Sequence, residues 1–421
     1  MTGPSLSTNR PPWDKQRLAT GTGLLIVGLV IFLLFARGTL PGQTSTFGMN
    51  AGGTALLIPD LAIPVQPGLY ALILVTVFAG AWQMARGGAR SAGWLIGIAA
   101  FCFVAAFLIW ATNEKSLNLV GMLSSTLGRA TPIALAALCG VISERAAVVN
   151  IGIEGIMLIA AQTAVISASM TRSLWIGLVV ALLSGALVAA AHAILVIRFK
   201  VDQIVSGVAI NIFGVGLTSF VAQRYLERDV DFLNNSGTFK IISIPVLSKI
   251  PILGPIFFEN SPVVYGMLLL VLVLHVLLFH TPWGLRTRAV GEHPRAADTL
   301  GINVYLTRYV NVILGGIIAG LGGAYFTLGA VGRFDQNMTA GKGFIGLAAM
   351  IFGKWTPIGA SLSSLLFGFA DSLQVKMQIL SVPIPSSFLA MAPYVVTMIV
   401  LTGIVGRAIP PAADGTPYEK Q

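Results

Sequence analysis

Charged residues are scarce in this sequence. Asp, Glu, Lys and Arg make up only 10% of the 421 residues, whereas 55% are hydrophobic. A soluble domain carries about a quarter charged residues, so this chain has too few to cover a water-exposed surface of its size. The shortage argues against a soluble protein with a very large core and indicates that a lipid bilayer is the natural solvent of this protein.

Residues that carry catalytic or metal chemistry are also few. The two cysteines, Cys102 and Cys139, lie in apolar segments, and they form no disulfide framework or metal-binding spacing. A nucleotide-binding P-loop requires G-x-x-x-x-G-K-[ST]. The Gly-Lys pairs in "FGKW" and "AGKG" lack both the correctly spaced glycine and the following Ser or Thr. We therefore expect no catalytic residue, metal or cofactor on this chain, and no ATP hydrolysis by it alone.

Long apolar runs are what the chain has instead. A bilayer core of about 30 Å requires about 20 apolar residues per helix. Residues 343–375 are less regular, because the eleven residues "GFIGLAAMIFG" precede a "KWTP" break and are too few to cross. Such backbone is tolerated at membrane depth only inside protein or along a cavity. The expected fold is an all-α polytopic membrane protein with about 10–12 transmembrane helices, including a re-entrant or broken helix pair. The predicted spans are 19–36, 69–85, 93–111, 120–142, 149–170, 174–197, 203–223, 262–280, 307–330 and 385–405.

The net charge of +10 is interpreted through membrane topology. Basic residues of membrane proteins gather on cytoplasmic loops, and no basic run with interleaved aromatic residues indicates nucleic-acid binding. With the N-terminus in the cytoplasm, the basic loops 86–90 and 198–200 also lie inside. The segments 37–68 and 224–261, rich in Pro, Gly and Asn, are expected to be external loops. The tail 407–421 is predicted to be cytoplasmic and disordered.

Three ionisable residues, Arg129, Glu154 and Asp371, fall inside predicted spans. Such groups are costly in lipid, and a functional role is their default interpretation. The alternative is an internal ion pair, or a carboxylate that caps a helix N-terminus. The polar stretch 332–344 could line an entrance or form an ordinary loop. Our candidate substrate-pathway residues are Asn150, Glu154, Asn211, Phe334, Asp335, Asn337 and Asp371.

The stretch "GEHPRAADTLG" (291–301) is charged, although apolar segments flank it. Pro294 is tolerated in a first helical turn, and Gly301 is a plausible residue to end the helix. The sequence therefore predicts a short helix on the cytoplasmic face. A solvated loop is the alternative, but a short helix with small side chains is suited to a groove on another protein.

These residues carry a family resemblance. "VGEHPRAADTLGINV" resembles the coupling segment of ABC importer permeases of the simple-sugar and nucleoside branch. "SERAAVVNIGIEGIMLIAA" (143–161), "DQIVSGVAINIFGVGLT" (202–218), "NMTAGKGFIGLAAMIFGKWTPIGA" (337–360) and "FGFADSLQ" with "PIPS" (383–386) are similar to that branch as well. Within it, the likeness is greatest to nucleoside permeases that work with a basic-membrane-protein-type lipoprotein.

The resemblance implies an assembly in a bacterial plasma (inner) membrane. A second, usually non-identical permease, separate ATPase subunits that hold ATP and Mg²⁺, and an external substrate-binding lipoprotein are the expected partners, besides membrane lipid. The alternative function is a secondary transporter driven by an ion gradient through Glu154 and Asp371. The resemblance assigns coupling to the ATPase to Glu292, His293, Pro294, Arg295, Ala296, Ala297, Asp298 and Gly301.

The resemblance covers residues 120–405 and leaves the N-terminal region outside. Residues 1–118 hold three predicted spans where the family leads us to expect about one. The expected organisation is therefore an extended N-terminal region (1–118), a permease domain (119–406) and the tail (407–421).

Overall fold

The structure is a computed structural model that describes residues 15–50, 58–86, 89–385 and 408–420, together with Phe388 and Met391. The chain divides into two compact units. The first unit holds residues 1–120 and 376–383, and the second unit holds residues 121–375 and 384–421.

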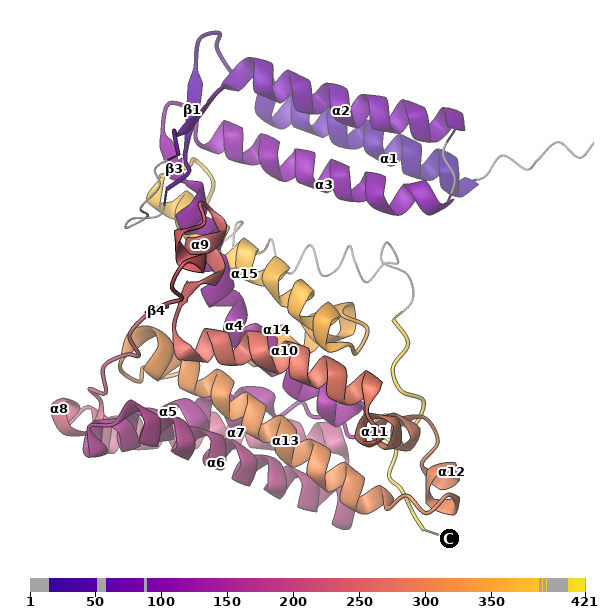
Figure 1. The fold of residues 1–421 in the computed structure, drawn as a ribbon, viewed down its shortest axis with the longest axis vertical. Coiled ribbons are helices and arrows are strands. Elements are labelled where there is room, and N and C mark those ends of the chain that lie inside the picture. Colours follow the sequence, from indigo (N-terminus) through magenta and orange to yellow (C-terminus); the bar gives the residue numbers. More distant parts are fainter. Residues whose placement is uncertain are drawn as a thin grey trace, which may run out of the picture. The chain divides into compact units, whose positions relative to one another are not determined.

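Three long helices form most of the first unit (Figure 1). They are α1 (Lys15–Ile31, extended by a π-helical turn, Phe32–Ala36), α2 (Val65–Arg86) and α3 (Ala89–Ala111). Gly21 lets α1 and α2 approach, because a Cβ atom there would lie 2.3 Å from Cγ of Met84.

A small sheet completes the first unit, and two of its three strands lie in the segment 37–68 that was predicted to be an external loop. Its central strand β1 (Thr44–Gly48) pairs antiparallel with β2 (Leu61–Pro64) and parallel with β3 (Ser116–Asn118). Strands of three to five residues are too short to show a clear period of two, which explains why the sequence pattern missed them.

Long helices also dominate the second unit. The central ones, α4 (Leu119–Glu144) and α5 (Ile153–Thr171), are largely buried. Around them lie α6 (Leu174–Ala193), α7 (Gln203–Val221), α10 (Pro262–His280), α13 (Val304–Ala324) and α15 (Pro357–Ile379). π-Helical turns extend α6 to Arg198, α7 to Leu226 and α13 to Val331.

Glycines allow α6 and α13 to pack closely. A Cβ atom at Gly316 would lie 2.2 Å from Cβ of Ala189, and one at Gly320 would lie 2.5 Å from the Ala181 carbonyl oxygen. Small residues four positions apart allow this kind of close packing in lipid. The Gly316–Gly320 pair is therefore a packing motif.

Short elements occupy the two ends of the second unit. Figure 1 shows α8 (Val230–Leu233) at one end and α11 (Pro282–Glu292) and α12 (Pro294–Thr299) at the other. The segment 224–261 also contains α9 (Leu253–Phe257) and a two-stranded pairing of β4 (Ile242–Ser243) with β5 (Glu259–Asn260).

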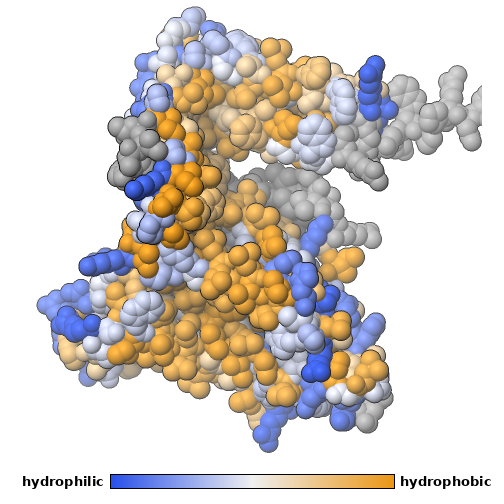
Figure 2. Space-filling model, in the orientation of Figure 1, coloured by the Kyte–Doolittle hydropathy of each residue, from blue (hydrophilic) through white to orange (hydrophobic). Residues whose placement is uncertain are grey.

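Ten helices among the described residues are long and apolar enough to cross a membrane. They confirm the predicted all-α polytopic fold, and every span predicted before residue 340 is present as a helix. The predicted span 385–405 lies outside the described residues, apart from Pro385, Phe388 and Met391. Figure 2 shows hydrophobic side chains over the sides of the long helices, where lipid would contact them.

The predicted helix break is also confirmed. The eleven-residue helix α14 (Lys342–Phe352) ends before Lys354 and Trp355, which both have φ of +53°. The 23-residue helix α15 then begins at Pro357. The α14 helix is too short to cross a bilayer, whereas α15 is long enough.

Candidate functional site

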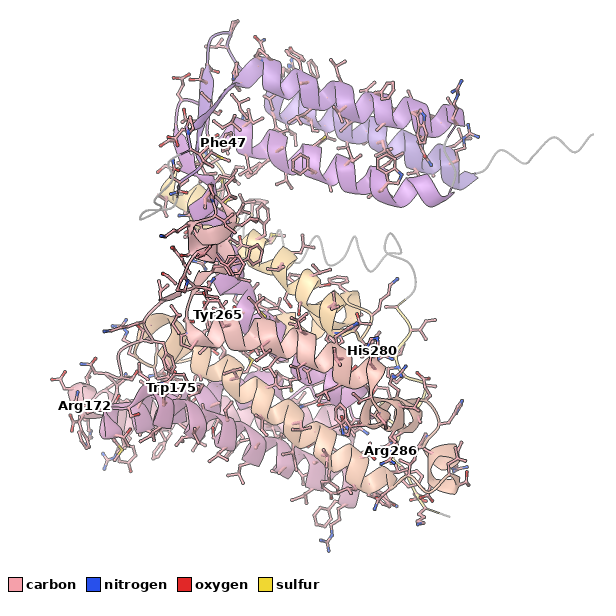
Figure 3. The ribbon with its side chains drawn as sticks, viewed as in Figure 1. Phe47, Arg172, Trp175, Tyr265, His280 and Arg286 are labelled. Atoms are coloured by element: carbon pink, nitrogen blue, oxygen red, sulfur yellow. The ribbon has the colours of Figure 1, made fainter. Side chains whose placement is uncertain are left out.

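The charged segment 291–301 contains the predicted short helix. The α12 helix begins at Pro294 and ends at Thr299, and Gly301 follows with φ of +82°. The residues before it are helical as well, because α11 runs to Glu292 and only His293, with extended φ and ψ, separates the two helices. Figure 3 shows Arg286 of α11 at the end of α10 where His280 lies.

One face of α12 is exposed and the other is buried. Arg295, Ala296 and Thr299 are exposed, and Leu300 at the end of the helix is 82% exposed. Ala297 is only 2% exposed and packs with Val290 and Val304. Single exposed apolar side chains are common on proteins, so Leu300 is a candidate contact because of its place at the end of α12 rather than because of its exposure alone. The sequence pattern did not select Leu300, since a single leucine in a chain this apolar carries no signal.

Two acidic residues of this segment bind the C-terminal residues. The Ala412 backbone amide donates to Oε2 of Glu292 over 3.2 Å. The Asp298 carboxylate lies 3.8 Å from Nζ of Lys420. Residues 408–420 therefore make defined contacts, which contradicts the disordered tail predicted from composition. Their partners lie more than a hundred residues away, where composition cannot show them.

Glu154, one of the candidate substrate-pathway residues, caps the N-terminus of a helix. Its Oε1 accepts from Oγ1 of Thr339 (2.6 Å) and the amide of Gly341 (2.8 Å), and its Oε2 accepts from the amide of Gly343 (2.6 Å). Gly341 and Gly343 flank the start of α14, where backbone amides have no intrahelical acceptor. The carboxylate thus stabilises the N-terminus of the short helix, which is the capping alternative that the sequence left open.

Two asparagines lie close to Glu154 and bind backbone. Oδ1 of Asn211 accepts from the Gly155 amide (2.8 Å), and its Nδ2 donates to the Ile151 carbonyl (2.9 Å). Oδ1 of Asn150 accepts from the Gly152 amide (3.1 Å). The structure therefore brings Asn150, Glu154 and Asn211 together around the start of α5.

The remaining candidates lie elsewhere. Phe334 is 3% exposed and packs in a separate apolar cluster with Leu158 and Leu226. Asp335 and Asn337 are exposed, and Asp335 pairs with Arg333 over 3.3 Å. Arg129 is exposed on α4. A contact with substrate stays a prediction for all of the candidate substrate-pathway residues.

Asp371 on α15 forms an ion pair with Lys342 at the start of α14. Their side chains are 14% and 21% exposed, so both charges are largely removed from solvent. Removing one partner of a buried pair leaves an uncompensated charge, whereas removing both leaves none.

We expect Asp371→Asn and Lys342→Met each to lower the free energy of unfolding by about 1–3 kcal/mol, less than for a fully buried pair. The double variant should recover most of this loss. Thermal unfolding of the detergent-purified protein measures all three. A normally stable Asp371→Asn variant that no longer transports would instead assign Asp371 to the substrate or a coupling ion.

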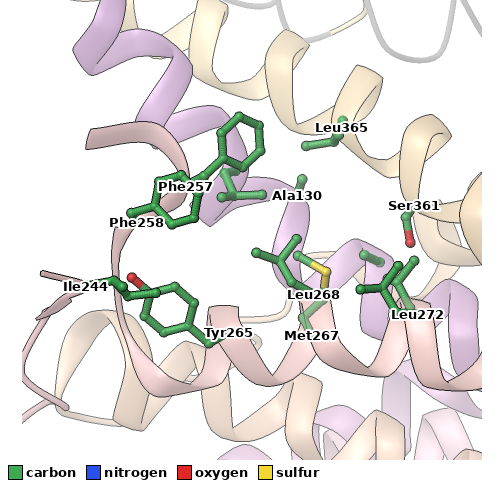
Figure 4. Close-up of a pocket in the computed structure, with 13 residues that line it drawn as sticks. Ala130, Ile244, Phe257, Phe258, Tyr265, Met267, Leu268, Leu272, Ser361 and Leu365 are labelled. Atoms are coloured by element: carbon green, nitrogen blue, oxygen red, sulfur yellow. The ribbon is translucent and has the colours of Figure 1, made fainter. Parts of the chain in front are cut away.

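An apolar cavity of about 400 Å³ lies within the second unit, between α4, α10 and α15. Figure 4 shows Phe257, Phe258 and Tyr265 on one side of it and Ser361 and Leu365 on another. Among the described residues that line it, Tyr265 and Ser361 are the only ones with polar side chains, and the Tyr265 hydroxyl already donates to the Ile242 carbonyl (2.8 Å). Sites for polar ligands need several convergent polar groups, so this cavity does not suit a polar substrate.

The ten long apolar helices of the described residues are those of a multi-span membrane protein. Residues 122–405 match the family described as "Branched-chain amino acid transport system / permease component". This match covers more than half of the chain, and the protein belongs to that family. No solved structure matches the chain significantly.

Three curated relatives show where the chain lies within the family. It is 44% identical over 308 residues to the guanosine ABC transporter permease protein NupQ of Bacillus subtilis, covering 70% of this chain and 95% of NupQ. It is 44% identical over 299 residues to the nucleoside ABC transporter permease protein NupC of Lactococcus lactis, covering 69% and 94%. The putative glucose ABC transporter permease protein TsgC13 of Haloferax volcanii is 37% identical over 261 residues, covering 62% and 79%.

Proposed function

We propose that this chain is the permease subunit of an ABC importer for nucleosides and forms half of the translocation pathway. The observation that carries the proposal is the 44% identity to a guanosine permease and a nucleoside permease over 94–95% of their lengths. The glucose relative is less similar and is covered over a smaller share of its length. Nucleosides are therefore preferred to sugars as the substrate class.

The energy for transport comes, in this proposal, from ATP and Mg²⁺ bound to separate ATPase subunits. The helix α12, with Arg295, Ala296 and Leu300 exposed on one face, is the docking element on this chain. A short helix that inserts into a groove can transmit the motion of its partner to the helices that follow it. This assignment places α11, α12 and both chain termini on the cytoplasmic side of a bacterial plasma membrane.

The other partners are a second permease and an external substrate-binding lipoprotein. Support for a non-identical second permease comes from Bacillus subtilis, which has a further guanosine ABC transporter permease protein, NupP. NupP is only 24% identical to this chain over 282 residues, compared with 44% for NupQ. We therefore propose a heterodimer in which this chain takes the NupQ-like position.

The contacts of the two intramembrane carboxylates do not favour the alternative of an ion-driven transporter. A carboxylate that binds a coupling ion must be able to release its hydrogen-bond donors or its ion-pair partner within the protein. Glu154 accepts three hydrogen bonds from the segment 339–343, and Asp371 pairs with Lys342 of the same segment. Both carboxylates therefore hold α14 in place.

Uptake by the complete transporter tests the proposal. The chain should be co-expressed with an ABC ATPase, a second permease and a substrate-binding lipoprotein, and reconstituted in liposomes with labelled guanosine. We expect uptake to require ATP, to stop when the P-loop lysine of the ATPase is replaced, and to persist when ion gradients are collapsed. Unlabelled guanosine should compete and glucose should not. Uptake driven by an ion gradient without ATP would refute the proposal.

A further inference from the structure

The C-terminal segment 408–420, called the strap below, crosses the short helices α11 and α12. The Ala413 amide donates to the Gly291 carbonyl over 2.9 Å, beside the contact between Ala412 and Glu292. Gly291 itself packs against the end of α4, because a Cβ atom there would lie 2.3 Å from the Arg145 carbonyl oxygen, whereas its 3.5 Å distance from Cβ of Pro411 would be an ordinary contact. In Figure 1 the strap runs beside α11 and ends near α12.

Tyr418 anchors the strap beneath α12. It is 6% exposed and packs with Val290, Ala297 and Val304, which come from α11, α12 and α13. Its ring centroid lies 5.3 Å from that of Tyr305, a favourable distance for an aromatic pair. The Tyr305 hydroxyl also donates to the Tyr418 carbonyl over 3.4 Å.

The strap has further contacts on both sides of Tyr418. Nη1 of Arg308 donates to the Thr416 carbonyl over 3.1 Å, and Lys200 pairs with Glu419. Asp414 interacts electrostatically with the buried Glu144 carboxyl at the end of α4, and burial raises the pKa of Asp414 to about 6. The strap thereby connects α4, α11, α12, α13 and the loop that follows α6.

The α12 helix needs these contacts. It has only six residues, and isolated helices shorter than about 12–15 residues are marginal in water. Its stability must therefore come from packing, and Ala297 is its one buried side chain. The prolines at 410, 411 and 417 restrict the free tail, which lowers the entropy lost when the strap docks.

We propose that the strap holds α12 in its docking orientation, with Tyr418 as the positioning residue, and that it forms one composite ATPase-docking surface with α12. This inference rests on the proposed function, since it assigns the ATPase as the partner of that surface. In this arrangement Glu292 and Asp298 contact the strap, and Arg295 and Leu300 are the residues that contact the ATPase.

The test uses the complete transporter carrying Tyr418→Ala, Tyr418→Phe or a truncation after Gly415. Hydrogen exchange of the α12 amides, co-purification of the ATPase and guanosine uptake per ATP hydrolysed are measured. We expect Tyr418→Ala and the truncation to speed exchange of α12 by about tenfold or more, and to lower uptake per ATP, with normal amounts of protein in the membrane. Tyr418→Phe keeps the ring and should retain most of the activity. Ile409→Ala, at a 78% exposed strap residue, is the matched control and should change nothing.

Each outcome decides between the two proposals. If Leu300→Asp on α12 prevents ATPase association while Tyr418→Ala and the truncation leave exchange and coupling unchanged, the strap inference is wrong and the proposed function stands. If Leu300→Asp has no effect on ATPase association either, α12 is not the docking element and the strap inference is wrong, whereas the proposed function falls only if uptake does not require ATP. Loss of coupling without faster α12 exchange would also overturn the positioning role of Tyr418.

Discussion

Leu300→Asp should weaken the association of this protein with its ATPase by about a hundredfold or more, which is the range of interface hot spots. Leu300 is 82% exposed at the end of α12, in a segment too charged to enter lipid. An apolar side chain in that position gains most by entering a pocket of the partner. An aspartate there would place an unpaired charge in the same pocket, which adds a desolvation cost to the lost contact.

The measurement is co-purification of the ATPase with the tagged permease, followed by uptake of labelled guanosine in liposomes. Leu253→Asp is the control, because Leu253 is 50% exposed on α9, in the segment predicted to lie outside. Both variants should reach the membrane in normal amounts, since neither site is buried. ATPase binding that survives Leu300→Asp would show that α12 is not the docking element.

Glu154→Gln should destabilise the folded protein rather than remove a substrate contact. The glutamine keeps one acceptor oxygen, but its NH₂ group would face the Gly343 amide or the donors Thr339 and Gly341. A buried donor without an acceptor costs about 1–3 kcal/mol, and more where the lost partner was charged. Loss of the negative charge from the α14 N-terminus adds to the cost.

Thermal unfolding in detergent and the yield of monodisperse protein measure this effect. We expect Glu154→Gln to lower both the unfolding temperature and the yield of monodisperse protein. Glu227→Gln is the matched control, because Glu227 is exposed and accepts a single hydrogen bond from Gln336 (3.0 Å). A Glu154→Gln protein with normal stability and lost uptake would return Glu154 to the substrate pathway.

At Glu154 the sequence limited the possible roles to two but could not choose between them. A carboxylate in a predicted span allowed either a functional group or a helix cap. The choice between these two roles depended on which donors bind the Glu154 carboxylate, and those donors lie about 185 residues further along the chain. Lys342 is likewise 29 residues from Asp371. A local sequence pattern cannot show that residues so far apart in the chain are neighbours in space, so only the tertiary structure decides between the two interpretations.

The sequence by itself determined the features that depend on neighbouring residues. Apolar runs of about 20 residues predicted the spans before residue 340, the "KWTP" break predicted the interruption between α14 and α15, and Pro294 and Gly301 predicted the limits of α12. Hydropathy, proline and glycine act within a few residues of themselves, so a linear pattern is enough to find their effects.

The tertiary structure alone decided which charged residues of the segment 291–301 are exposed and which bind within the chain. Glu292, although exposed, and Asp298 contact the strap, and Arg295 and Leu300 are exposed as well. The strap has the composition of a disordered tail, and its order comes from contacts with Val290, Ala297 and Tyr305. Such contacts join residues about 120 positions apart, which no local preference connects.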